Sequence, residues 1–180
     1  MKNKIATLIL GILLIGIASA GLVDYLSNII TGEVEVKGPV FYATAGNKLL
    51  INEFDNSTVS YSIQDSDDEK FWSEKFSESL NFYIPSLTMS IRARVVNGTL
   101  PKNLELVFGY YSGDDLIKIC DKEVSVNSEE YGVYSVSCEG TEELEDVDGF
   151  YYKIIGMGTQ EVECRISVSN GDTRVEMDKA

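Results

Sequence analysis

The sequence predicts an all-β fold, an antiparallel β-sandwich (jelly-roll-like) with an N-terminal signal segment and one or two short helices. Apolar and polar residues alternate along residues 87–95 and again along residues 162–168, as in strands that bury one face. Many similar runs are separated by Gly, Asn, Asp and Ser, and no alternation of strands with helices indicates a parallel sheet. The 180 residues are enough for one such domain and a targeting segment.

The expected strands are short and are bounded by turn residues. In chain order they are residues 33–36, 40–43, 49–54, 58–63, 87–95, 104–108, 116–119, 131–138, 150–157, 162–168 and 173–177. A helix is expected over residues 67–79, where aromatic residues recur near helical spacing, and residues 22–30 are a second candidate. Nothing in the pattern indicates a domain boundary after the signal segment.

The N-terminus has the pattern of a secretory signal peptide. Lys2 and Lys4 precede an uncharged run over residues 5–18, which leads to small residues around Ala20 and Gly21. We expect cleavage between Ala20 and Gly21, which gives the domains 1–20, 21–36 and 37–180. The alternative is an uncleaved anchor, because the uncharged stretch continues past Ala20 and is just long enough to span a bilayer. Contact with a membrane is expected only during export or through such an anchor, and in both cases the body lies outside the cytoplasm.

The cysteines predict a disulfide between Cys120 and Cys138. A hairpin that turns at residues 127–130 places these two residues opposite each other. Closing a loop of this size stabilises a fold by about 3 kcal/mol in the chain-entropy model. Pairing of Cys138 with Cys164 is the alternative, since connectivity does not follow from sequence. If Cys120 pairs with Cys138, Cys164 remains a free, buried thiol.

Charge and composition exclude several classes of function. The formal net charge is −14, and no run of Lys and Arg is present to bind phosphates, so we expect no nucleic-acid partner. The chain contains no His, which removes the commonest general base and the commonest ligand of catalytic zinc. We therefore expect that the protein is not an enzyme.

Two acidic segments, residues 65–69 and 142–149, offer carboxylates to calcium. Neither reproduces the ligand spacing of an EF-hand loop, so solvated loops are the expectation and calcium binding is the weaker alternative. Pairs of carboxylates can also hydrolyse glycosides, but only when they face each other across a cleft, and sequence spacing does not show that. No cofactor is expected.

Asn56 and Asn97 begin Asn-X-Ser/Thr sequons in turn-like surroundings between strands. In an exported protein they are candidate glycosylation sites, and chance occurrence of the motif is the alternative.

The start of the predicted mature chain resembles a known family. An apolar export signal that ends in small residues is followed by Tyr-Leu-Ser-Asn at residues 25–28 and by Thr-Gly-Glu-Val-Glu-Val at residues 31–36. This arrangement resembles the TasA/camelysin-type biofilm matrix proteins and the related archaeal bundling pilins. The likeness is clearest over residues 18–38. Camelysin also carries a metalloprotease label, which the absence of His in this chain argues against inheriting.

The resemblance implies a fibre subunit whose N-terminal strand completes the sandwich of the next identical subunit, giving a homopolymeric filament. The residues implied for this donor strand are Leu22, Val23, Tyr25, Leu26, Ile29 and Ile30. Within a monomer the same stretch has two other uses, a short amphipathic helix or an ordinary first strand.

Three functions from different classes follow from the sequence. The first is a subunit of an extracellular filament or pilus, a cell-surface appendage in cell–cell adhesion or a biofilm matrix. The second is a membrane-anchored cell-surface binding module that does not polymerise. The third is a secreted hydrolase that uses carboxylates.

Overall fold

The structure is a computed structural model, and it describes residues 38–52, 58–66, 68–158, 161–166 and 171–178. The chain divides into two units, residues 1–37 and residues 38–180, and all described residues belong to the second unit. The predicted signal segment, the cleavage site, the donor-strand residues and the expected strand at residues 33–36 therefore lie outside the described residues.

The described residues form strands and no helix, as an all-β sandwich requires. The strands are β1 (Val40–Ala43), β2 (Leu49–Ile51), β3 (Val59–Ile63), β4 (Glu69–Asn97), β5 (Lys102–Ser112), β6 (Asp115–Val126), β7 (Gly132–Gly156), β8 (Glu161–Ile166) and β9 (Arg174–Met177). Every pairing between these strands is antiparallel, which confirms the predicted fold class.

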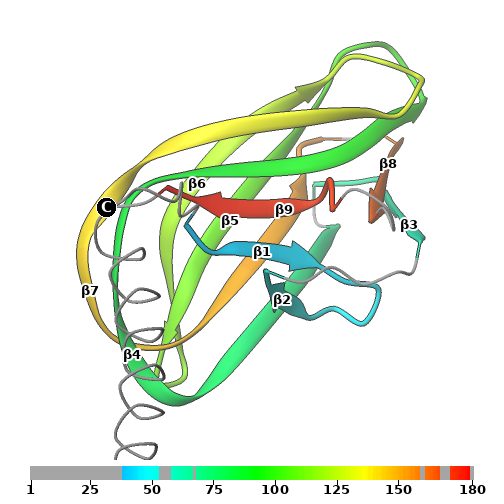
Figure 1. Cartoon of the computed structure of the whole chain (residues 1–180). Helices are drawn as coiled ribbons and strands as arrows, with labels where there is room; N and C mark the ends of the chain where they lie inside the picture. Colours follow the sequence, from blue (N-terminus) through cyan, green and yellow to red (C-terminus); the bar gives the residue numbers. More distant parts are fainter. Residues whose placement is uncertain (1–37, 53–57, 67, 159–160, 167–170, 179–180) are drawn as a thin grey trace, which may run out of the picture. The chain divides into compact units, whose positions relative to one another are not determined.

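The strand order is β2-β1-β9-β4-β7-β5-β6, and β8 pairs with both β3 and β4. The first part of β4 pairs with the last part of β7, β7 pairs with β5, and β5 pairs with β6. These segments together form one layer. The later part of β4 pairs with the start of β7 on one side and with β9 and β8 on the other. These segments form the second layer. Figure 1 shows β4 and β7 curving together from one layer into the other.

The curve lies where the pairing of β4 with β7 loses its regular register, between Lys75 and Ile84. Gly140 is in β7 at one end of this irregular stretch, and a Cβ there would overlap the carbonyl oxygen of Ile84. Gly149 is at the other end, where a Cβ would overlap the carbonyl oxygen of Glu74. The two strands approach closely enough to bend together because neither glycine has a side chain.

Aromatic side chains fill the space between the layers. The ring of Phe41 in β1 contacts Phe108 in β5 and Phe150 in β7, with centroids 5.8 and 5.0 Å apart, so these contacts join one layer to the other. Trp72 is fully buried, and its Nε1–H donates a hydrogen bond of 2.9 Å to the carbonyl oxygen of Thr44. Burial of each of these large side chains contributes roughly 1.5–3 kcal/mol to stability.

The helix expected over residues 67–79 is wrong, because the described part of this range lies largely in β4. Trp72 points into the main core, whereas Phe71 lies on the other face and stacks on Tyr151 at 5.7 Å. A strand with apolar residues on both faces loses the two-residue alternation that identifies strands in a sequence. Its aromatic spacing then resembles that of a helix.

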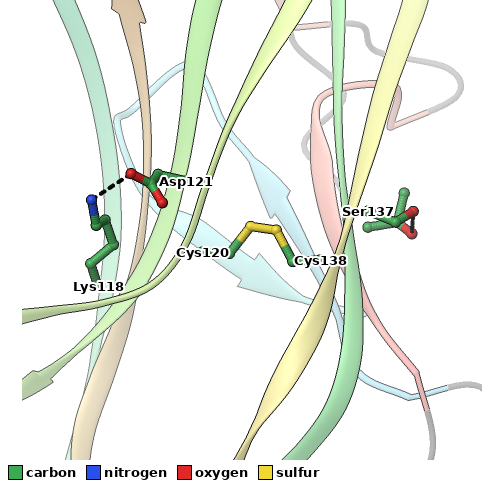
Figure 2. Close-up of a disulfide and its surroundings, with 6 residues drawn as sticks. Lys118, Cys120, Asp121, Ser137 and Cys138 are labelled. Atoms are coloured by element: carbon green, nitrogen blue, oxygen red, sulfur yellow. Dashed lines mark hydrogen bonds and ion pairs between the residues drawn. A yellow bond between two sulfur atoms is a disulfide. The ribbon is translucent and has the colours of Figure 1, made fainter.

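Cys120 and Cys138 are joined by a disulfide, with Cα atoms 6.2 Å apart, and Cys164 is a free, buried thiol. The hairpin used to predict this pair is nevertheless wrong. Cys120 in β6 pairs with Phe108 of β5, and Cys138 in β7 pairs with Leu87 of β4. The bond therefore crosses between strands of the two layers, and Figure 2 shows Ser137 on the other side of β7 from it.

We expect the double variant Cys120→Ala/Cys138→Ala to lose roughly 3 kcal/mol of unfolding free energy, because the bond closes a loop of 18 residues that restricts the unfolded chain. Urea unfolding of the oxidised full chain measures the loss. As the control, dithiothreitol should destabilise the wild type by a similar amount and leave the double variant unchanged. Equal sensitivity of both proteins to the reductant would contradict the assignment.

Candidate binding face

The outer face of the second layer is polar, and β4 sets its pattern. Leu87, Met89 and Ile91 are fully buried, so the residues between them point away from the core. The residues of this part of β4 that lie on the outer side are Ser86, Thr88, Ser90, Arg92 and Arg94, of which Ser90 is buried by its neighbours and the other four are half-buried. The alternation that predicted a strand at residues 87–95 therefore also determines which side chains are available outside.

Strand pairing extends this polar face sideways. In the pairing of β4 with β7, Thr88 of β4 lies opposite Ser137 of β7, and Ser90 lies opposite Ser135. Each pair of hydroxyls is hydrogen-bonded at 2.9 Å, and both serines of β7 are exposed. On the other side of β4, Arg92 lies opposite Arg165 of β8. The face is therefore a surface of hydroxyl and guanidinium groups.

Three arginines surround one tyrosine on this face. The guanidinium carbons of Arg94, Arg165 and Arg92 lie 4.8, 5.2 and 6.0 Å from the centre of the Tyr131 ring. Tyr131 comes just before β7, whose first residue pairs with a residue of β4 between the two arginines of that strand. We call Arg92, Arg94, Arg165 and Tyr131 the arginine–tyrosine cluster. Cation–π attraction favours this packing, and like-charge repulsion among the guanidinium groups opposes it.

Two guanidinium groups of the cluster have carboxylate partners. Arg92 forms an ion pair with Asp172, and Arg94 binds the Oε2 atom of Glu163 through Nε at 2.8 Å and through a second nitrogen at 2.7 Å. Among the described residues no carboxylate lies within 4.0 Å of the Arg165 side chain. The cluster therefore carries more positive than negative charge in its immediate contacts.

Glu163 has an altered acidity at this site. Burial alone would raise the pKa of its carboxyl group, but hydrogen bonds from Arg94, Tyr131 and Ser60, together with the charge of Arg94, lower the pKa below its ordinary value. The pKa of Arg94 is raised, mainly by its hydrogen bond to Glu163. Both groups are therefore ionised at neutral pH and hold each other in place.

The face gathers all of the arginines in a strongly acidic chain. The sequence has four, Arg92, Arg94, Arg165 and Arg174, against a net charge of −14. Arg174 in β9 lies opposite Ser90 of β4, next to the cluster, and it pairs with Glu176 at 2.9 Å. The sequence shows no run of basic residues because the pairing of β4 with β8 brings together positions about 70 residues apart.

The loop expected over residues 142–149 is wrong, because these residues lie within β7, and carboxylates of both predicted calcium segments accept hydrogen bonds within the fold. Asp68 accepts a bond of 2.8 Å from the backbone N–H of Gln64. Asp148 accepts bonds from the Ser79 hydroxyl at 2.5 Å and the Gly113 N–H at 2.6 Å, and these bonds lower its pKa. In the part of the chain that the structure describes, no group of three or more Cys, Asp or Glu residues is arranged to hold a metal ion.

Of the two predicted glycosylation sites, Asn56 lies outside the described residues and Asn97 is the exposed last residue of β4. Glycosylation of either residue stays a prediction. An open groove lies beside the disulfide and is lined by Ile119, Asp121, Lys122 and Glu139 among others. Asp121 there forms an ion pair with Lys118 at 2.5 Å (Figure 2).

Cys164, the one free cysteine, is not placed to act as a nucleophile. Cys164 is buried, and burial, with a smaller contribution from the charge of Glu163, raises the pKa of its thiol to about 12. The thiol is therefore protonated at neutral pH and is out of reach of a substrate. A search of the described residues also finds no helix with the length and apolar character needed to cross a membrane.

No model of a known protein family matches this chain, and no curated protein matches it. The solved structures that resemble it in fold include three enzymes. A CocE/NonD family hydrolase from Staphylococcus aureus has a TM-score of 0.58 and 6% identity, covering 79% of this chain and 36% of the hydrolase. An α-amino acid ester hydrolase has a TM-score of 0.56 and 9% identity over 79% of this chain and 36% of that one. An aminopeptidase from a marine sediment Thaumarchaeota archaeon has a TM-score of 0.55 and 8% identity over 77% and 36%.

At these identities the likeness concerns the fold alone. The chain spans little more than a third of the length of each enzyme. None of these three structures is described as a TasA/camelysin-type protein or as an archaeal bundling pilin.

We expect Glu163→Gln to destabilise the protein by roughly 1 kcal/mol at pH 7, the value of a partly exposed, charge-assisted hydrogen bond. Because folding lowers the pKa of Glu163, its stabilisation is complete above the unfolded pKa of about 4.3 and is lost as the pH falls through the folded value. The difference between variant and wild type should therefore shrink below pH 4.

Urea unfolding between pH 7 and pH 3 measures this difference. Glu123→Gln, which changes an exposed carboxylate on β6, is the matched control and should have a small effect at pH 7. A destabilisation by Glu163→Gln that stays constant over this pH range would contradict the stabilising role of its charge.

Proposed function

We propose that this protein is a non-catalytic, exported binding module that takes a polysaccharide on the polar face of β3, β8, β4 and β7. The arginine–tyrosine cluster is the observation that carries this proposal. It places three half-buried guanidinium groups and a phenol together on one face of the sheet. The hydroxyls of Ser135 and Ser137 lie on the same surface.

The chemistry of the face favours a polysaccharide over a peptide. An extended peptide usually binds a sheet by adding a strand at its edge through main-chain hydrogen bonds. The face of a sheet offers only side chains, and the groups here are hydroxyl, guanidinium and phenol donors. Such groups suit a polymer that is recognised through its own hydroxyl and acid groups.

The position of the cluster on the face of a sheet favours binding over catalysis. Catalytic groups act best in an enclosed site where water is excluded and a base stands beside a nucleophile. The exposed Ser137 and Ser135 of this face bond to Thr88 and to the buried Ser90 of β4, and the chain has no His to activate them. The hydrolase function considered from the sequence needs two free carboxyl groups that face each other across a cleft, whereas the Glu163 carboxylate of this face is engaged by Arg94.

Export is supported by two independent features. The N-terminal sequence has the pattern of a signal peptide. The body contains a disulfide, and structural disulfides persist in oxidising compartments outside the cytosol. We therefore place the module at the cell surface, either released or held by an uncleaved anchor.

Co-sedimentation of the oxidised full chain with xylan, cellulose, dextran and polygalacturonate tests the proposal. We expect retention by at least one of these polymers, and Tyr131→Ala should weaken it about tenfold because the ring orders the surrounding arginines. Tyr83→Ala is the matched control, because Tyr83 is exposed and lies at the bend of β4.

Thermal unfolding verifies that both variants fold. Retention by none of the four polymers would sink the proposal, and equal retention of Tyr131→Ala and wild type would move the site away from the cluster.

The filament remains our alternative proposal, since its donor residues lie outside the described part. The structure adds one constraint. Cys120 and Cys138 hold β6 and β7 with Cα atoms 6.2 Å apart, whereas an intervening strand needs roughly 9.6 Å. A donor strand would therefore have to add at another edge, such as that of β3, which among the described strands pairs only with β8.

We expect that, if the filament forms, electron microscopy of the oxidised full chain at high concentration shows fibres and deletion of residues 21–30 abolishes them. The substitutions Leu22→Ser and Leu26→Ser should weaken assembly without unfolding the body. A thermal melt of each variant verifies that the body is folded. A wild type that sediments as a monomer at millimolar concentration would refute assembly and leave the binding module intact.

A further inference from the structure

We propose that the arginine–tyrosine cluster recognises a carboxylate group on its polysaccharide ligand, with Arg165 as the main contact. This inference rests on the proposed function, because it specifies which polysaccharides the face accepts. The ligand class is a saccharide polymer that contains uronic acid residues.

The balance of charges in the cluster is the first argument. Three guanidinium groups lie within 6.0 Å of the centre of the Tyr131 ring, and two carboxylates, of Asp172 and Glu163, pair with them. Arg165 is the one that has no carboxylate within 4.0 Å among the described residues. One added carboxylate would neutralise the cluster and relieve the repulsion between its guanidinium groups.

Unused hydrogen-bond donors are the second argument. Arg94 pairs with Glu163 through Nε and one terminal nitrogen, and its side chain keeps 39% of its surface exposed. A guanidinium group has five N–H donors in a planar fork that matches a carboxylate. The Arg94 guanidinium group therefore keeps N–H donors that a ligand on this face can use.

The surrounding hydroxyls indicate what carries the carboxylate. The Tyr131 hydroxyl lies 3.2 Å from that of Ser60 in the exposed part of β3. Hydroxyl pairs continue along β4 and β7 next to the cluster. A ligand centred on Arg165 would therefore meet alcohol groups on both sides, as the ring and hydroxyls of a sugar require.

The overall charge of the chain decides against densely charged polyanions. A double-stranded nucleic acid carries one charge per about 1.7 Å and needs many Lys and Arg contacts. This chain has a net charge of −14, and its other basic residues on this face are already paired. A single local excess of positive charge suits a ligand that presents one carboxylate at a time.

Isothermal titration of the oxidised full chain with oligogalacturonate and with its methyl ester tests the inference. The ester keeps the sugar backbone and removes the charge, so we expect its affinity to be lower by roughly tenfold to a hundredfold. EDTA is present throughout, so that calcium does not bridge the acidic ligand to the protein. The affinity for oligogalacturonate should also fall between 50 and 500 mM salt, about as a single ion pair predicts.

Arg165→Gln should reduce the affinity for oligogalacturonate to that for the ester, and Arg165→Lys should restore only part of the loss, because an ammonium group lacks the planar fork. The matched control is Lys122→Gln, which removes one positive charge from an exposed residue of β6 in the other layer. This control should bind oligogalacturonate within about twofold of the wild type.

The outcomes separate this inference from the proposed function. If the acid and its ester bind equally well, and Tyr131→Ala weakens both, the module binds polysaccharides but the recognition of carboxylates is wrong. If Arg165→Gln binds the acid like the wild type, Arg165 is not the contact. If no saccharide tested binds at millimolar concentration, both the inference and the proposed function fail.

Discussion

The pairing of β4 with β7 over nearly their whole lengths is the constraint on which the rest of the structure depends. Each strand belongs to both layers, so this single pairing determines where the sheet bends and the register of the outer face. The same pairing places Cys138 where β6 of the opposite layer can reach it. It also places Tyr131 beside Arg94, because the first residue of β7 pairs with Ala93. The disulfide, the core and the polar face therefore all follow from one register.

Much of the fold could be predicted from the sequence, because burial of one face leaves a two-residue period. The strands around Leu87 and Val162 follow this rule. The rule fails at Phe71 and Trp72, since apolar residues lie on both faces of β4 there. The cysteine pair was predicted through a hairpin that does not exist, because neighbouring segments of the chain belong to different layers.

The arginine–tyrosine cluster could not be predicted, although each of its members is visible in the sequence. Arg92 and Arg94 mark the polar side of a strand, as charged residues commonly do. Their meeting with Arg165 depends on the pairing of β4 with β8, which local patterns do not encode. The resemblance in fold to parts of larger hydrolases does not supply the missing information, because a shared sandwich leaves the side chains on its faces free to differ.

The first and last parts of the described body lie side by side, since the N–H of Met177 donates a hydrogen bond of 3.1 Å to the carbonyl oxygen of Pro39. Met177 also lies opposite Leu87 of β4, and Arg94 is seven residues further along that strand. At about 3.3 Å per residue, the cluster lies roughly 23 Å along β4 from these two ends of the described body. The arginine–tyrosine cluster and the two ends of the described body therefore lie at opposite ends of this stretch of β4.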